Sequence, residues 1–228
     1  MIRRREFITL LGGAAVAWPL SARAQPSGKT YRIGFLGPTS YAERKRDVDA
    51  LRTGLRQLGY EEGRNIVIHY RWAEGRYDRL AEFAAELVKL NMDVIVTVST
   101  PGALAAKQAT STIPIVMAAV GDPVAAGIVA SLARPSGNLT GLIFFFAEIC
   151  AKRVELIKEA MLEYGVDLAD LYSRSAAFVD KILKGTPPAD LPIERAVKFE
   201  LIVNLKTAKA LGIELPTSIL LRANEVLE

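Results

Sequence analysis

The chain has 228 residues, of which 50% are hydrophobic, 24% are charged and 7% are aromatic. This composition is that of an ordinary globular protein, and it excludes a disordered, collagen-like or coiled-coil chain. The single cysteine, Cys150, and the single histidine exclude an intrachain disulfide, a cysteine-based zinc site and multi-histidine metal chemistry.

Residues 1–24 have the pattern of an export signal, because arginines at positions 3–5 precede an apolar run and small residues stand at positions 22 and 24. The run is shorter than the roughly 20 residues that a membrane-spanning helix needs. Residues 4–8 are similar to a twin-arginine signal, with a general secretory signal as the alternative. We therefore expect a periplasmic protein. Removal of the signal lowers the formal net charge from +4 to about +1, so charge gives no reason to expect nucleic acid or membrane binding.

From residue 31 the hydrophobic pattern alternates between the periods of strands and helices. It predicts strands over residues 31–37, 66–72, 94–98, 113–117 and 139–146, and helices over residues 48–58, 80–90, 101–109, 123–133 and 148–162. The continuous β-branched run at 94–98 is typical of a central parallel strand. Five successive β/α units predict an α/β fold with a doubly wound parallel sheet of order 2-1-3-4-5.

The remaining sequence forms a short α/β tail with a different pattern. It predicts a helix over residues 167–183, a strand over 199–203, a short helix that begins after Asn204 and ends at Gly212, and a helical stretch after Pro216. We expect this tail to be too short to build a second sheet of its own.

In an open sheet of this order, a ligand lies at the carboxyl ends of the strands, between the first and third strands. A helix is expected to begin in the loop after each of these strands. Ser40 with Glu43 fits a capping box after the first strand, and Thr100 places a capping hydroxyl before a proline after the third. Asp122 starts the next helix. Hydroxyl caps favour an anion and a carboxylate cap attracts a cation, so together they suit a zwitterion. The alternative is that all three are only helix caps, each contributing about 1 kcal/mol.

The sequence carries neither a G-x-G-x-x-G nor a G-x-x-x-x-G-K-[ST] motif, which disfavours a dehydrogenase or an ATPase. We expect no cofactor and no metal ion. Trp72, at the carboxyl end of the second strand, is a candidate for stacking on a ligand, with packing against the next helix as the alternative. An enzyme on the same scaffold is the weakest hypothesis, because no catalytic set is visible.

Several long blocks of sequence resemble the ABC transporter substrate-binding proteins of bacteria, in the group related to tryptophan- and tyrosine-binding periplasmic proteins. The blocks are residues 3–13, 51–80, 113–142, 170–192 and 198–212. The resemblance implies a two-lobed, exported protein that is not an enzyme. It would capture a small amino acid or carboxylate in its cleft and deliver it to an ABC permease in the inner membrane.

The resemblance is interrupted near residues 160–161, where about 100 residues, the size of a small domain, are missing relative to the family. The expected organisation is a signal at 1–24, a first lobe at 25–160, and a remnant of the hinge and second lobe with C-terminal helices at 161–228. An internally deleted derivative that folds but no longer transports is therefore the rival hypothesis. The uncovered lobe face would favour self-association.

The resemblance also implies a set of ligand-binding residues. Ser99 and Thr100 would hold a carboxylate, and Asp122 would accept from an ammonium group. Tyr41 or Trp72 would provide an aromatic wall. The complete candidate set is Thr39, Ser40, Tyr41, Trp72, Ser99, Thr100, Gly121 and Asp122, with Tyr164 and Gly165 at the hinge.

Overall fold

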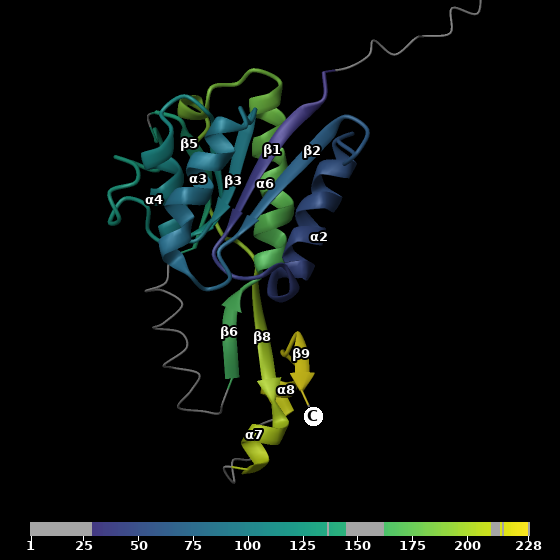
Figure 1. The fold of residues 1–228 in the computed structure, drawn as a ribbon. Helices are drawn as coiled ribbons and strands as arrows, with labels where there is room; N and C mark the ends of the chain where they lie inside the picture. Colours follow the sequence, from purple (N-terminus) through teal and green to yellow (C-terminus); the bar gives the residue numbers. More distant parts are fainter. Residues whose placement is uncertain (1–28, 136, 145–161, 211–214, 216, 228) are drawn as a thin grey trace, which may run out of the picture.

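The computed structural model describes residues 29–135, 137–144, 162–210, 215 and 217–227. Its larger part is a six-stranded parallel sheet in the order β2-β1-β3-β4-β5-β7 (Figure 1). The predicted doubly wound order 2-1-3-4-5 is confirmed, with β7 added beside β5. The strands are β1 (Tyr31–Gly37), β2 (Ile66–Trp72), β3 (Val94–Val98), β4 (Ile115–Val120), β5 (Leu139–Ile143) and β7 (Glu194–Arg195).

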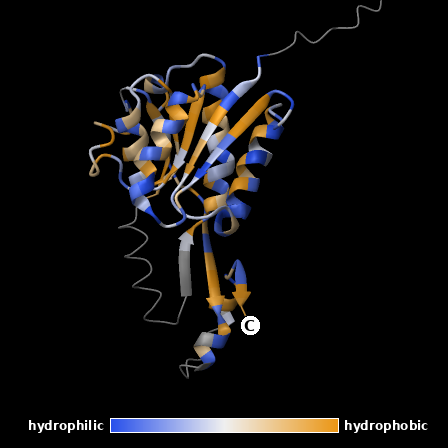
Figure 2. Cartoon of the chain, viewed as in Figure 1, coloured by the Kyte–Doolittle hydropathy of each residue, from blue (hydrophilic) through white to orange (hydrophobic). Residues whose placement is uncertain are grey.

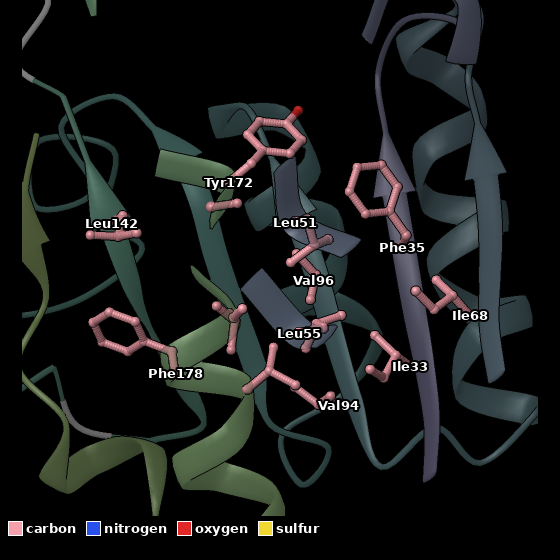
Figure 3. Close-up of a cluster of buried hydrophobic side chains, with 14 of the residues drawn as sticks. Ile33, Phe35, Leu51, Leu55, Ile68, Val94, Val96, Leu142, Tyr172 and Phe178 are labelled. Atoms are coloured by element: carbon pink, nitrogen blue, oxygen red, sulfur yellow. The ribbon is translucent and has the colours of Figure 1, made fainter. Parts of the chain in front are cut away.

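Helices cover both faces of this sheet. On one face lie α2 (Tyr41–Gln57) and α6 (Leu168–Leu183), and on the other lie α3 (Leu80–Lys89), which follows a short 3-10 turn, and α4 (Thr100–Ala109). Side chains along each strand alternate between the two cores, as Phe35 on the α2 face and Leu36 on the α4 face of β1 illustrate. Figure 3 shows the core under α2 and α6, and Figure 2 shows the strands as the apolar centre of this body.

The helices α2 and α6 approach each other closely at Gly54. A Cβ atom at this position would lie 2.5 Å from the carbonyl oxygen of Ser173 and 3.0 Å from the Cβ of Ala176. The two helices share the core residues Leu51, Leu55 and Tyr172. Helix α6 and strand β7 therefore belong to the six-stranded body.

A second, smaller sheet has the order β6-β8-β9 and extends from the body at the carboxyl ends of its strands (Figure 1). The prediction that the tail is too short to form a sheet is thus wrong. Residue 162, predicted to end a helix, instead begins β6, and the rest of that predicted helix, with Cys150, lies outside the described residues. The elements are β6 (Leu162–Val166), β8 (Phe199–Asn204), α7 (Leu205–Ala210), α8 (Thr217–Leu220) and β9 (Glu225–Leu227).

The small sheet has little core. Val203 and Ile219 form its buried hydrophobic cluster, with partly buried side chains around them. Strand β8 pairs antiparallel with β6 and parallel with β9. The pairing of β6 with β8 joins segments more than thirty residues apart, which a pattern read along the chain does not show.

The helix predicted over residues 123–133 is absent, and turns take its place. Asp122 starts a turn by accepting hydrogen bonds from the N–H groups of Val124 and Ala125. Gly127 then takes a left-handed conformation with φ of 67°, which ends the turn before a helix can propagate. The apolar residues there still pack inward, since Ile128 and Val129 are buried.

The described part of the chain contains no helix with the length and apolar character needed to cross a membrane. The predicted export signal at residues 1–24 lies outside the described residues.

Candidate ligand-binding site

The carboxyl ends of β1, β2, β3 and β4 carry the loops that hold most of the candidate residues. Thr97 on β3 donates its hydroxyl to the carbonyl of Leu36 on β1 at 3.3 Å, and the N–H of Ser99 donates to the carbonyl of Ala119 on β4 at 2.8 Å. These bonds hold the ends of three neighbouring strands together. The candidate loops therefore emerge side by side at one edge of the sheet.

The loop after β1 is fixed from both sides. The hydroxyl oxygen of Ser40 accepts a hydrogen bond from the N–H of Glu43 at 3.4 Å, as predicted for the cap of α2. The carbonyl of Thr39 accepts from the N–H of Glu74 in the loop after β2. The Oγ1 atom of Thr39 is buried and has no hydrogen-bond partner among the described residues. A buried hydroxyl without a partner costs about 1–3 kcal/mol, so this atom is suited to bind a water molecule or a ligand.

Trp72 lies in a cluster of aromatic rings at this edge. Its ring centroid is 5.0 Å from that of Phe35, 6.1 Å from that of Tyr41 in a T-shaped arrangement, and 6.4 Å from that of Tyr70 in a parallel one. The indole lies over Gly37, its partner across the strand pair, where a Cβ would be 2.4 Å from two ring carbons. Trp72 is partly buried on the α2 face of the sheet, whereas α3, the next helix, lies on the other face, so the expected packing against that helix is not found. Its neighbour Tyr41 is 38% exposed.

The start of α4 differs from the prediction in one respect. The capping residue is Ser99, whose hydroxyl oxygen accepts from the N–H of Gly102 at 3.3 Å, and Thr100 is the first residue of the helix. Ser99 has a left-handed backbone with φ of 67°, a conformation that non-glycine residues seldom adopt and that costs of order 1–3 kcal/mol. Such strain recurs at ligand-binding positions.

Thr100 and Gly121 are brought together by this arrangement. The Oγ1 atom of Thr100 would lie 3.3 Å from a Cβ atom at Gly121. The next residue, Asp122, is exposed, and its Oδ1 atom accepts the N–H groups of Val124 and Ala125 at 2.9 and 3.0 Å. These bonds leave Oδ2 as the oxygen with which Asp122 can meet a cation.

Tyr164 and Gly165 lie apart from this cluster, on β6 of the small sheet. Their partners across the strand pair are Leu201 and Glu200 on β8. The strand leads into Asp167, which caps α6 by accepting from the N–H of Asp170 at 3.0 Å. The two hinge candidates thus sit where the chain passes between the small sheet and the body.

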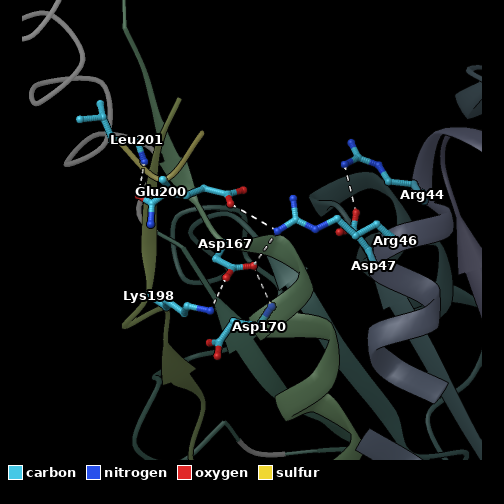
Figure 4. A network of polar contacts seen from close by, with 9 residues as sticks. Arg44, Arg46, Asp47, Asp167, Asp170, Lys198, Glu200 and Leu201 are labelled. Atoms are coloured by element: carbon cyan, nitrogen blue, oxygen red, sulfur yellow. Dashed lines mark hydrogen bonds and ion pairs between the residues drawn. The ribbon is translucent and has the colours of Figure 1, made fainter. Parts of the chain in front are cut away.

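A charged network joins the body to the small sheet at this passage (Figure 4). Arg46 on α2 extends toward Glu200 at 3.4 Å and Asp167 at 4.0 Å, and Lys198 contacts Asp167 at 2.7 Å. Burial acts to raise the pKa of Asp167, but its hydrogen bonds with Lys198 and the N–H of Asp170 outweigh burial and lower it. The same network lines a cavity of about 340 Å³ together with Phe199, Asn224 and Glu225.

Two glycines and one arginine with a part in the site were not among the predicted residues. Gly37 makes room for Trp72, and Gly102 makes room for Thr97, whose Oγ1 would be 2.6 Å from a Cβ there. Gly37 stands opposite Trp72 in the pairing of the first two strands and could have been found from that register, whereas Gly102 lies in α4 and could not. Arg46 pairs with Glu200 across 154 positions of sequence, and no local pattern indicates such a contact.

The sequence profile of the family described as "ABC transporter substrate binding protein" matches residues 33–163 and 159–227. The chain belongs to this family. The family consists of solute-binding proteins of transport systems rather than enzymes. The two matched segments of this member meet and overlap at residues 159–163.

Among relatives of this family member, a tyrosine-binding protein of Clostridioides difficile is 40% identical over 104 residues. The alignment covers 46% of the chain but 30% of the relative, so less than a third of that protein's length is matched.

Solved structures share the fold. A Streptococcus pneumonia ABC domain in complex with L-Trp aligns with a TM-score of 0.76 at 20% identity, over 87% of this chain and 100% of that one. A conserved domain protein of Vibrio cholerae aligns with a TM-score of 0.77 at 23% identity, over 87% of this chain and 100% of that one. A ligand-free, open substrate binding protein from Clostridium difficile gives a TM-score of 0.72 at 21% identity, over 86% of this chain and 99% of that one. At these identities the likeness concerns the fold.

Proposed function

We propose that this chain is the solute-binding component of an ABC importer, which captures a small amino acid or carboxylate and delivers it to an inner-membrane permease. The observation that carries the proposal is the cluster at the carboxyl edge, where strained Ser99 places Thr100 beside Gly121. The family membership supports the transport role. The signal-like residues 1–24 support export to the periplasm, by the twin-arginine or the general pathway.

The carboxylate of the ligand would bind at the start of α4. Pro101 has no N–H, and the N–H of Gly102 is taken by Ser99. The donors left for an anion are the N–H of Thr100 and the hydroxyls of Ser99 and Thr100. The ten-residue helix behind them adds the positive end of its dipole.

The other end of a zwitterion would meet Asp122, through the Oδ2 atom that its local turn does not use. Tyr41, exposed beside Trp72, would provide the aromatic wall for the side chain. The unpartnered Oγ1 of Thr39 offers one further polar contact. A tyrosine-binding relative and a neighbour in complex with L-Trp support an aromatic amino acid as the ligand.

A second candidate is an internally deleted derivative that folds but transports nothing. It is supported by the two family matches, which meet near residue 160, and by the small core of the β6-β8-β9 sheet. A two-lobed protein that binds at about 1 μM has a binding free energy of about −8 kcal/mol, and half of its contacts would leave about −4, in the millimolar range. The lobe face at the carboxyl edge would then favour self-association.

The proposal is tested by thermal melts of the full chain against aromatic and branched amino acids and small carboxylates. A ligand that binds only the folded state adds about 2.7 kcal/mol of stability at one hundred times its Kd. Asp122→Ala should weaken binding of an amino acid, whereas Asp190→Ala, an exposed carboxylate on the short turn at Pro188–Asp190, should not. A cooperative melt that no ligand shifts would favour the deleted derivative. If Asp122→Ala bound an amino acid with the same Kd as wild type, the proposed contact between Asp122 and the ammonium group would be refuted.

A further inference from the structure

Tyr70 lies on β2 two residues before Trp72, with its ring beside the indole. The two rings are parallel within 4°, with centroids 6.4 Å apart. Both side chains point to the α2 face of β2, two residues apart, as the alternation of a strand requires. The Tyr70 ring thus lies beside the indole of Trp72, and the indole in turn lies 6.1 Å from the ring of Tyr41.

Arg52 on α2 holds Tyr70 in place by two contacts. Its Nε–H donates to the Tyr70 hydroxyl at 3.0 Å, and its guanidinium carbon lies 5.2 Å from the centre of the Tyr70 ring. Burial raises the pKa of Tyr70 to about 12, so the phenol stays neutral at physiological pH. Arg52 is itself oriented by Glu62 at 3.1 Å and Asp49 at 3.6 Å.

We propose that Tyr70, fixed by Arg52, is a positioning residue: it sets the orientation of Trp72 and thereby the preference of the site for an aromatic over an aliphatic amino acid. This rests on the proposed function, since it concerns the selectivity of that same site. The role needs no contact between Tyr70 and the ligand. It would act through the chain of contacts that runs from Arg52 through Tyr70 to Trp72.

Trp72 supplies a direct optical readout, because Trp18 and Trp72 are the two tryptophans of the chain. In a full chain that carries Trp18→Phe, tryptophan emission reports on Trp72 alone. Tyr70→Phe keeps the stacked ring but removes the acceptor of the Arg52 hydrogen bond. Tyr60→Phe is the matched control, since the Tyr60 hydroxyl also makes one hydrogen bond, to Asp180 at 3.0 Å, but packs against Tyr31, away from Trp72.

The experiment measures Trp72 emission and the Kd values for L-phenylalanine and L-leucine by calorimetry. One hydrogen bond contributes enough that its loss in Tyr70→Phe should shift the emission and lower the ratio of the leucine to the phenylalanine Kd by roughly two- to tenfold. Tyr60→Phe should change neither. Arg52→Met should act through the same contact, so the double variant should have the ratio of Tyr70→Phe alone.

A Kd ratio unchanged in Tyr70→Phe, with wild type binding L-phenylalanine, would overturn the proposal whatever the emission does. A wild-type chain that binds neither amino acid would instead refute the proposed function and the selectivity with it. The emission then decides the positioning of Trp72 by itself: a shift in Tyr70→Phe supports it, and an unchanged spectrum overturns it.

Discussion

Gly54→Ala tests whether the chain after residue 161 is built into the first body. In a helix that faces solvent, this change would stabilise the protein by up to about 1 kcal/mol, because alanine favours the helix. Here the new Cβ would meet the Ser173 carbonyl oxygen at 2.5 Å and the Ala176 Cβ at 3.0 Å. An ordinary contact is about 3.5 Å, so α2 and α6 would have to separate by roughly 1 Å.

Overpacking of this kind costs about 1–3 kcal/mol, and the contact with a backbone oxygen leaves no side chain that can turn aside. Because that oxygen cannot move aside, we take the upper part of this range, about 2–3 kcal/mol. Subtracting the helix gain of about 1 kcal/mol leaves a net loss of about 1–2 kcal/mol, which lowers Tm by about 2–8 °C in a chain of this size. The assay is a thermal melt followed by circular dichroism. Thr53→Ala, at the exposed neighbouring position of α2, is the control and should keep Tm within about 2 °C. A Gly54→Ala variant with an equal or higher Tm would show that α6 does not pack against α2.

Two further predictions concern strain and charge. Ser99→Gly and Ser99→Ala both remove the capping hydroxyl, but only glycine adopts the left-handed backbone without strain. The free energy of unfolding of Ser99→Gly should therefore be about 1 kcal/mol higher than that of Ser99→Ala. Equal denaturant midpoints for the two variants would contradict backbone strain at this residue. The pKa of Asp167 is lowered from 3.8 in the folded state, so its contribution to stability is complete above that pH and is lost as pH falls below it. Asp167→Asn, which retains the cap, should therefore be less stable than wild type at pH 7 and equal to it near pH 2; a stability gap that persists in acid would refute the ionic origin of the effect.

The six-stranded body could be predicted where local pattern and tertiary environment agree. The β-branched residues 94–98 are all buried, as the continuous run indicates, and the Ser40 cap of α2 is where its spacing places it. The predicted strand at 113–117 is found slightly later, at Ile115–Val120. At residues 123–133 the apolar spacing fits a helix, but the backbone of Gly127 ends the turn.

The candidate site could be predicted only in part, because its loops are local but its contacts are not. Sequence spacing identified the loops at Ser40, Thr100 and Asp122. Ser99 is the cap because its backbone is left-handed, and the presence of a serine in the sequence does not predict that conformation. The pairing of β6 with β8 and the ion pair of Arg46 with Glu200 join distant segments, and periodicity carries no information on them.

The most direct test of the account is the calorimetric titration of the full chain and its Thr100→Val variant with L-tyrosine and L-tryptophan. Valine keeps the shape of threonine and removes the hydroxyl proposed to hold the ligand carboxylate. A hydrogen bond to a charged group contributes about 1.5–3 kcal/mol, so we expect wild type to bind and the Kd to be at least about tenfold weaker in Thr100→Val. Binding of equal strength in the two proteins would contradict a ligand site at the carboxyl ends of β3 and β4.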